Sequence, residues 1–585
     1  MAQEFLYAPR EGYQFIHATY VKDDYNDALV ANIKNMETNE SMLEIIKNPK
    51  LPVWVTKPCY RNYNSKREFS PENELDRYVT TFRNLPETLS KALGYHRIFP
   101  MYQLMKSPYV YGAKIGPDNI MKSEYYTLTE GLLPVLNYGG LDIETDVTGS
   151  RRINLMTYAD KKRHTAYCCV LKDFLKDEET IDVLKKRWHD RYKQFVKQLK
   201  PSVRERLDKT PFTVRFRICE TEEELIRACF GVIHACKPDF CIIWNISFDL
   251  PYIENRIIEL GLNPADIICH PEVPMQYRYY YFQYDKSFTQ HITDKWHWVY
   301  CTGYTQFIDG MPLYARNRKA ESKESSYGLD AISGKVLGTG KIEFEGNATH
   351  YIMQTERFVD YAVYNTFDGI LLVLMEEENE DIDTMLILSK TSPLDVYSKQ
   401  TVRLTNEFYR YCRDRNCVCA SVQGSIRGEN DWMIVKLGGA VLDVSKSRGT
   451  GLNLPGLGQT ELQMYVADLD VKSEYPSLDQ ALNIAKETKL ATVITITNMP
   501  GGDGWIPTKV ECDNYAKMHP KDPYAPYHVD YYLNIVEDYF ANIATPEENA
   551  EYICHKYYGL PTYMELADLV ANLMDNEQAS NIGVI

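Results

Sequence analysis

The feature that most constrains the fold is an alternation of buried strands and helices between residues 132 and 260. The segment LLPVLNYGGLDIETD predicts a buried strand that ends in acidic residues, and NLMTYADKKRHTAYCCVL predicts two further strands joined by a polar turn. Residues 173–208 are highly charged with a helical period. A helix, a turn and a buried strand over residues 240–245 follow, and then another helix. Strands that alternate with helices favour an α/β layer, so we expect a mixed sheet covered by helices.

The later part of the chain gives further local predictions. Residues 277–300 are aromatic and β-branched with a polar centre, which is typical of a long hairpin. Helical periodicity then predicts one helix from about 356 to 378 and another from 381 to about 415. A Gly-rich section over residues 424–458 leads into a strand at MYVADLDV.

Composition limits the class of protein. A chain of 585 residues is too long to fold around a single hydrophobic core, so we expect three or four domains. Its content of 44% hydrophobic and 25% charged residues is typical of globular proteins. The fourteen cysteines form no CxxC pair, which favours a reducing, cytoplasmic setting. The N-terminus shows no signal-peptide pattern, and no apolar run approaches a membrane span, so we expect no membrane partner.

A formal net charge of −16 argues against a surface that is basic throughout. Local basic stretches do occur at residues 161–164, 185–200 and 316–319, and each has the ordinary alternative of a solvated helix face. A protein that handles DNA would therefore need a local basic surface, or a partner that supplies one.

Two carboxylates close the first predicted strand. Asp142 and Glu144 are two residues apart, so they project from one face while Ile143 points into the core. Adjacent carboxylates repel each other unless a cation lies between them, and Mg²⁺ prefers carboxylate oxygen. The alternative is a solvated strand end.

Two more fragments carry acidic residues at structurally defined points. In Asn245-Ile246-Ser247-Phe248-Asp249 a buried strand gives way to a helix, where an Asp is also an ordinary N-cap. In Tyr364-Asn365-Thr366-Phe367-Asp368 the tyrosine and aspartate share one helix face at i and i+4, although a helix with one polar position is the plain alternative.

Together the three fragments resemble the exonuclease motifs of family B DNA polymerases, DIE, Nx₂FD and YNx₂D, in the same order and at similar spacing. LPYIENR, SYGLDAISGKVLG and FIDG resemble flanking segments of that family, and the aromatic segment 277–300 lies where it places a hairpin that moves the primer strand. The resemblance implies a ribonuclease H-like exonuclease domain with 3′→5′ proofreading activity.

The resemblance also implies roles for individual residues. Asp142, Glu144, Asp249 and Asp368 would hold two Mg²⁺ ions, or Mn²⁺, at the scissile phosphodiester. Tyr364 would orient the attacking water. The substrate would be a frayed single-stranded 3′ end, and Asn245 and Phe248 would shape the site around it. A mismatched end costs less to unpair, so it would enter more often.

A later segment resembles the first palm motif of the same family, and ALNIAKETKLATV after it resembles the following palm stretch, most closely that of T-even-type bacteriophage polymerases. In Asp470-Val471-Lys472-Ser473-Glu474-Tyr475-Pro476-Ser477, the resemblance makes Asp470 a metal ligand and assigns Ser473 and Tyr475 to nucleotide binding. Glu474 departs from the family pattern, because it replaces a usual leucine. The sequence contains no fingers motif of the KxxxNSxYG type and no DTD motif for the second palm carboxylate.

The predicted organisation is α/β and α+β multidomain. We expect a polymerase N-terminal domain over 1–125, the exonuclease domain over 126–390, a helical linker region over 391–460 and an incomplete palm over 461–585. The favoured function is one subunit of a split, replicative viral polymerase that binds primer-template DNA. A second polymerase chain would then be needed before dNTPs are used, and a sliding clamp is a further expected partner. A truncated product, a stand-alone 3′→5′ exonuclease and a non-catalytic replisome scaffold are the alternatives.

Overall fold

The computed structural model describes residues 5–22, 27–63, 67, 69–285, 291–319, 323–339 and 349–421. The chain divides into two units, Met1–Gln423 and Gly424–Ile585, and every described residue belongs to the first. The strand predicted at MYVADLDV and the palm-like motif lie outside the described residues.

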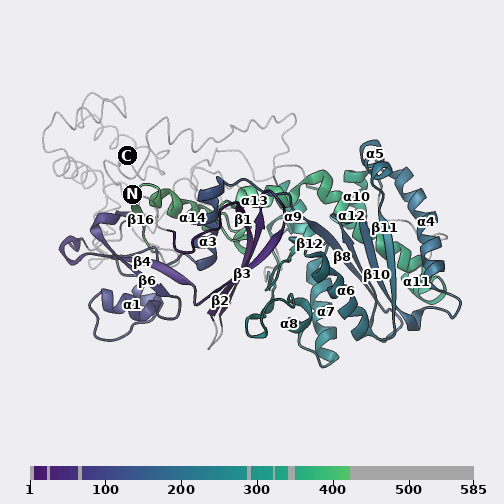
Figure 1. The fold of residues 1–585 in the computed structure, drawn as a ribbon, viewed down its shortest axis with the longest axis horizontal. Coiled ribbons are helices and arrows are strands. Elements are labelled where there is room, and N and C mark those ends of the chain that lie inside the picture. Colours follow the sequence, from purple (N-terminus) through teal and green to yellow (C-terminus); the bar gives the residue numbers. More distant parts are fainter. Residues whose placement is uncertain are drawn as a thin grey trace, which may run out of the picture. The chain divides into compact units, whose positions relative to one another are not determined.

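A six-stranded mixed sheet is the framework of the first unit (Figure 1). Its strands, in the order in which they pair, are β11 (Thr213–Cys219), β10 (Thr165–Leu171), β9 (Ile153–Asp160), β8 (Tyr138–Thr145), β12 (Phe240–Ile243) and β15 (Gln306–Asp309). Strand β9 is antiparallel to both neighbours, whereas the other three pairs are parallel. The predicted mixed sheet within an α/β architecture is therefore confirmed.

Helices cover both faces of this sheet and enclose two apolar cores. On one face lie α12 (Phe358–Asn379), α4 (Ile181–Gln198), α5 (Pro201–Lys209), α10 (Leu329–Leu337) and α11 (His350–Glu356). On the other lie α6 (Glu222–Cys236), α7 (Ile246–Glu259) and α8 (Pro264–Ile268). Helix α12 packs on β8 and β9, and this contact positions the site described below.

Local sequence explains where the helices on the second face begin. The Thr221 hydroxyl accepts a hydrogen bond from the Glu224 amide and caps α6, whose first turn carries three glutamates at its positive end. Helix α7 starts three residues after β12 ends, with Asn245 as its N-cap residue. The chain thus turns sharply at the carboxyl end of β12, and α7 begins at that edge of the sheet.

The N-terminal part of the unit is built from two antiparallel sheets. The first contains β1 (Tyr13–Lys22), β2 (Asp27–Asn35) and β3 (Ser41–Lys47), and the second β6 (Leu75–Thr81), β4 (Lys50–Thr56) and β7 (Val110–Tyr111). The short helices α1 (Leu85–Ala92) and α2 (Met101–Leu104) precede α3 (Pro117–Thr129). A buried ion pair between Lys34 on β2 and Asp239, next to β12, ties this part to the central sheet.

The predicted helix over residues 381–415 is wrong as one element. It is divided into α13 (Asp381–Ser389) and α14 (Gln400–Arg413). Pro393 lies between them and has no amide hydrogen to continue a helix. The charged region 173–208 is likewise two helices, because α5 starts at Pro201. Strand β16 (Cys417–Cys419) then pairs with β5 (Phe69–Pro71), so the chain returns to its N-terminal part.

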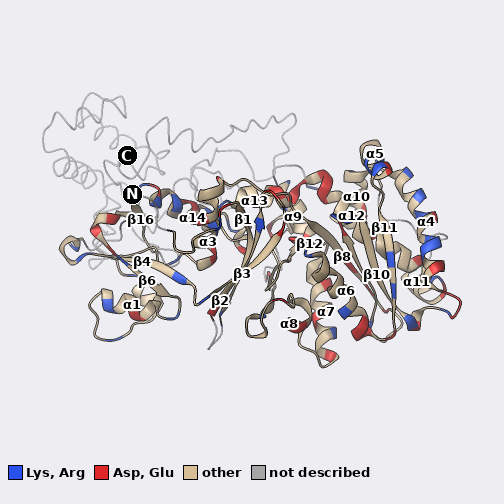
Figure 2. Ribbon diagram, viewed as in Figure 1, with Lys and Arg blue, Asp and Glu red and all other residues tan. Residues whose placement is uncertain are grey.

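The aromatic segment 277–300 is an antiparallel pair, as predicted, but its described strands are short. Strands β13 (Tyr280–Gln283) and β14 (Trp298–Cys301) pair over four residues each. Helix α9 (Gly310–Asn317) follows β15 directly. Acidic and basic residues are interspersed over the described helices and strands (Figure 2).

Among the described residues, one helix, α12, could cross a membrane by length and composition alone. Within its most apolar 18-residue window, however, 89% is buried inside the protein. The expectation that no apolar run approaches a membrane span is therefore too strict. Burial on all sides explains why α12 is apolar nearly all round.

Candidate metal centre

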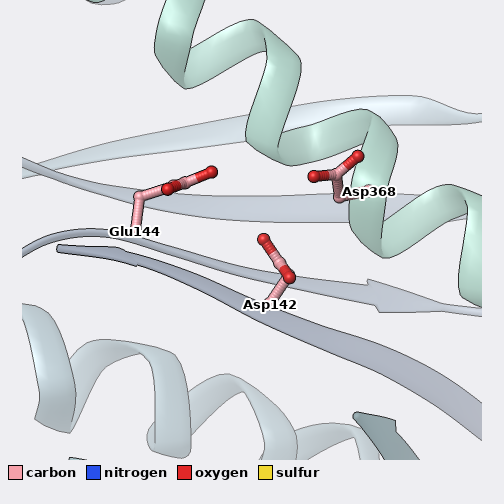
Figure 3. Close-up of side chains that lie close together, drawn as sticks. All are labelled: Asp142, Glu144 and Asp368. Atoms are coloured by element: carbon pink, nitrogen blue, oxygen red, sulfur yellow. The ribbon is translucent and has the colours of Figure 1, made fainter. Parts of the chain in front are cut away.

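The two carboxylates of β8 project from one face of the strand, as its alternation predicts. Leu141 and Ile143 are buried in the core beneath α6 and α7. Asp142 and Glu144 lie on the opposite face, toward α12, and both are half-buried (Figure 3). Asp142 is paired with Thr157 of β9 in the antiparallel register.

Glycines let α12 come unusually close to these strands. A Cβ placed on Gly140 of β8 would lie 2.5 Å from the carbonyl oxygen of Gly369 and 2.7 Å from the Leu372 Cβ. A Cβ on Gly369 itself would lie 3.1 Å from the Thr157 Cγ2. The helix backbone therefore approaches the strand backbone with no side chain between them. Asp368, which precedes Gly369, is thereby held over the strand face.

The close approach brings Asp368 to Asp142 and Glu144. One carboxylate oxygen from each residue lies within 4.8 Å of the other two (Figure 3). Asp368 is buried, with 1% of its surface exposed. Three carboxylates this close repel each other in a partly buried site, and a bound cation offsets that repulsion. An all-oxygen donor set fits a hard divalent ion such as Mg²⁺ or Mn²⁺.

Two side chains of α12 fix the orientation of these carboxylates. The Tyr361 hydroxyl donates a hydrogen bond to Glu144 Oε2. Asn365 Nδ2 donates to Asp142 Oδ2 over 2.6 Å, and the Asn365 Oδ1 accepts from the Thr157 hydroxyl over 2.5 Å. Burial, followed by the charge of Glu144, raises the pKa of Tyr361 well above its ordinary value. The tyrosine therefore stays protonated and remains a donor.

Sequence reasoning did not assign functions to Tyr361 and Asn365. Asn365 stands inside the YNx₂D motif, and Tyr361 lies seven residues before Asp368, a spacing that returns to the same helix face. The helical spacing therefore places both residues on the same face as Asp368 and could have predicted them as its neighbours. Hydrogen-bond partners of this kind orient ligands and tune the affinity for a metal.

Tyr364 lies on α12 and is largely buried, with 8% of its surface exposed. Its ring is parallel to that of Tyr361, with an interplanar angle of 2° and 6.2 Å between centroids. Tyr361 in turn donates its hydrogen bond to Glu144. Tyr364, which is predicted to orient water, is therefore packed beside a residue that contacts one of the three carboxylates. Its role toward water stays a prediction.

Asp249 is not a member of the group of three carboxylates. Helix α7 begins at Ile246 with Asn245 as its N-cap, so the alternative that Asp249 caps this helix is wrong. Asp249 lies instead in the first helical turn and is buried to 7% exposure. Asn245 is exposed, and Phe248 has 51% of its surface exposed, so both can meet a ligand.

A further buried carboxylate lies close to Asp249. Asp309 is the last residue of β15 and is 3% exposed. Burial raises the pKa of Asp309 well above its ordinary value, the Ile246 amide opposes this by hydrogen bonding, and the negative charge of Asp249 adds to the rise. The first turn of α7 is therefore a second place where acidic groups crowd together.

Asp146, the residue directly after β8, is also acidic, but it organises the following loop instead of joining the three carboxylates. Its two carboxylate oxygens accept hydrogen bonds from the backbone amides and hydroxyls of Thr148 and Ser150. Although burial opposes the change, these bonds lower the pKa of Asp146 to about 2. The residue organises the loop after β8. The predicted palm residues Asp470, Ser473 and Tyr475 lie outside the described residues.

Comparison with known proteins locates this site within a recognised kind of domain. No curated protein matches the chain. Residues 118–332 match the family model described as DNA polymerase family B, exonuclease domain. The matched range contains Asp142, Glu144 and Asp249, and the fold adds Asp368 from α12. This part of the chain is thus supported as an exonuclease domain of the DNA polymerase family B kind.

Proposed function

We propose that this chain removes nucleotides from the 3′ end of DNA and so proofreads synthesis by a family B polymerase. The observation that carries the proposal is the group of three carboxylates within 4.8 Å of one another. Two of them lie inside the range that matches the family B exonuclease domain. Within this proposal the sheet and its helices form a ribonuclease H-like domain.

Asp142, Glu144 and Asp368 are the residues that would hold a divalent ion, and Asp249 would complete a pair of ion sites. When bound, such ions lower the pKa of water and stabilise negative charge on the departing oxygen. We take Mg²⁺ as the physiological ion, because the donors are carboxylates.

The neighbouring residues of the chain would prepare this site for a DNA end. Tyr361 and Asn365 keep the carboxylates oriented through the hydrogen bonds described above. Tyr364 would orient the attacking water. The exposed ring of Phe248 offers a stacking surface to an unpaired base, and Asn245 offers hydrogen bonds beside it.

Selection of mismatches would come from the substrate itself. A site that accepts only a single strand requires the terminal pair to open, which costs least at a mismatch. The rate should therefore follow the ease of melting, with single strands cut fastest and matched duplex ends slowest.

The test is degradation of a 5′-labelled oligonucleotide by the purified chain with Mg²⁺. We expect a ladder of products shortened one nucleotide at a time from the 3′ end, and none when a chelator is present. Asp142→Asn should abolish the ladder. Asp177→Asn, which removes an exposed carboxylate outside the site, should leave it unchanged. Release of the 5′-terminal nucleotide first, or equal activity of both variants, would reject the proposal.

The palm-like residues Asp470, Ser473 and Tyr475 support a second proposal, that the chain takes part in templated synthesis. Within this second proposal, a second polypeptide supplies the fingers and the remaining palm, and a sliding clamp holds the assembly on DNA. Adding a chain that carries the fingers and DTD motifs should give template-dependent dNTP incorporation. The setting would be the cytoplasm, that of the host if the source is viral.

A further inference from the structure

A cavity of about 400 Å³ lies where the end of α9 meets the start of α14. Its lining includes Arg316 near the end of α9, Lys319 just beyond that end, and Gln400 and Arg403 from the first turn of α14. The volume is within the range of sites that bind small ligands. None of the lining residues belongs to the group of three carboxylates, which comes from β8 and α12.

The charges that line this cavity are mainly positive. Arg316, Lys319 and Arg403 contribute three cations, and Asp294 contributes one carboxylate. Lys319 donates to that carboxylate over 2.5 Å, so these two charges neutralise each other. The guanidinium groups of Arg316 and Arg403 remain as the excess positive charge.

Both guanidinium groups retain donors for a ligand. Arg316 Nη2 reaches the Lys295 carbonyl at 3.4 Å, and Arg403 Nη1 donates to the Leu388 carbonyl at 2.9 Å. The buried Nε atoms of both arginines have no hydrogen-bond partner within the part of the chain that the structure describes. These Nε atoms are closed off from the cavity, but each guanidinium group has five N–H donors and the bonds above use one of them, so terminal donors remain for an acceptor in the cavity.

The two arginines also disfavour each other. Burial lowers the pKa of Arg316; Asp294 opposes this change, whereas the positive charge of Arg403 adds to it. Arg403 lies over the ring of Tyr397, with 5.1 Å from its guanidinium carbon to the ring centroid. A bound anion would relieve the repulsion between the two cations and pair with both.

The first turn of α14 adds a third attraction for an anion. This helix of 14 residues has no side-chain cap hydrogen bond at Lys399, its N-cap residue. The first amides of a helix lack intrahelical acceptors, and the helix dipole places positive potential at this end. Gln400, the first residue of α14, lines the cavity.

We propose that this cavity is a binding site for a phosphate group, held by Arg316, Arg403 and the start of α14. The phosphate belongs either to a free nucleotide or to the backbone of a single DNA strand, and the chemistry of recognition is the same for both. Forked guanidinium groups suit phosphate oxygens better than ammonium groups do. The proposal does not depend on exonuclease activity, because Asp142, Glu144 and Asp368 take no part in it.

The experiment is calorimetric titration of the full chain with three probes: pyrophosphate, deoxyadenosine monophosphate and a short oligothymidylate. Chelator is present throughout, so that metal-dependent hydrolysis cannot consume the oligonucleotide. The variants are Arg403→Gln and Arg316→Gln. Arg415→Gln is the matched control, because it removes one exposed positive charge just beyond the end of α14. Thermal unfolding of each variant confirms that it is folded.

We expect Arg403→Gln and Arg316→Gln each to weaken binding about 10- to 100-fold, as loss of charge-assisted hydrogen bonds does. Arg415→Gln should change it less than about twofold. If Arg403→Gln and Arg316→Gln weaken binding of the mononucleotide, the site takes free nucleotides. If they weaken binding of the oligonucleotide alone, the site takes a DNA strand. Absence of binding by every probe, or equal weakening by all three variants, would overturn the proposal. If Arg316→Gln does not fold, Arg403→Gln and its control decide alone.

Discussion

Replacing Gly140 by alanine should separate α12 from β8 and disable the site without touching a carboxylate. The new Cβ would lie 2.5 Å from the Gly369 carbonyl oxygen, whereas ordinary contacts begin at 3.4 Å. Both obstacles, that oxygen and the Leu372 Cβ, belong to the helix and cannot rotate away. The helix must therefore retreat by about 1 Å, and Asp368 must move with it.

A displacement of this size is large for catalysis and moderate for stability. Misplacing reacting groups by about 1 Å costs on the order of 100-fold in rate. Overpacking a core costs about 1–3 kcal/mol of unfolding free energy. The Gly140→Ala variant should thus remain folded at room temperature while its Mg²⁺-dependent release of 3′ nucleotides falls about 100-fold.

Gly231→Ala is the matched control for this variant. Gly231 is an exposed residue of α6, and a Cβ placed there would meet nothing within 4 Å. Alanine should stabilise that helix by about 0.5–1 kcal/mol and leave the rate unchanged. Rates are measured on single-stranded oligonucleotides, and folding is followed by urea titration. If Gly140→Ala retains activity within twofold of the unaltered chain, the close approach of α12 does not set the site.

Three further predictions concern other contacts. Tyr361→Phe removes the hydrogen bond to Glu144, so the Mg²⁺ concentration for half-maximal nuclease activity should rise about 10- to 100-fold; an unchanged metal dependence would contradict this role. Burial lowers the pKa of His234 from 6.5 to about 4. Between these two pH values the unfolded chain binds a proton that the folded chain does not. The free energy of unfolding therefore decreases as the pH falls from 6.5 to 4, by up to about 3 kcal/mol. Urea titrations at pH 7 and pH 5 should show a smaller loss for His234→Gln, and an equal loss would refute the assignment. Lys34→Met leaves the buried carboxylate of Asp239 without its cation and should lower the free energy of unfolding by about 3–5 kcal/mol in the same assay; a change below about 1 kcal/mol would contradict that reasoning.

Short-range patterns predicted the parts of the site that lie on single elements. Alternation along β8 placed Asp142 and Glu144 on one face, because the strand period is two whatever surrounds it. Helical spacing likewise placed Tyr364 and Asp368 on one side of α12.

Contacts between distant elements were beyond such patterns. The approach of Gly369 to Gly140 joins residues more than 200 positions apart, and only the packed fold shows that both must lack a side chain. The division of α13 from α14 was missed although Pro393 marked it, because the helical period continues on both sides. The N-cap alternative for Asp249 would have started the helix too late, because α7 begins at Ile246 and follows the strand almost without a loop.

The cavity beside α14 was equally hidden in the sequence. Residues 316–319 resemble a solvated basic helix end, and nothing near them in sequence indicates that Arg403 lies across the same cavity. The positive charge of the cavity comes from the end of α9 and the start of α14, which only the tertiary structure brings together.

The central claim is that carboxylates of β8 and α12 form one metal centre, and Mn²⁺ binding tests it most directly. Calorimetric titration of the unaltered chain is compared with Asp368→Asn and with the control Asp177→Asn, which removes an exposed carboxylate outside the site. We predict that Asp368→Asn loses at least one bound ion, or binds it more than 10-fold more weakly, whereas the control matches the unaltered chain. Identical Mn²⁺ isotherms for all three proteins would contradict the account.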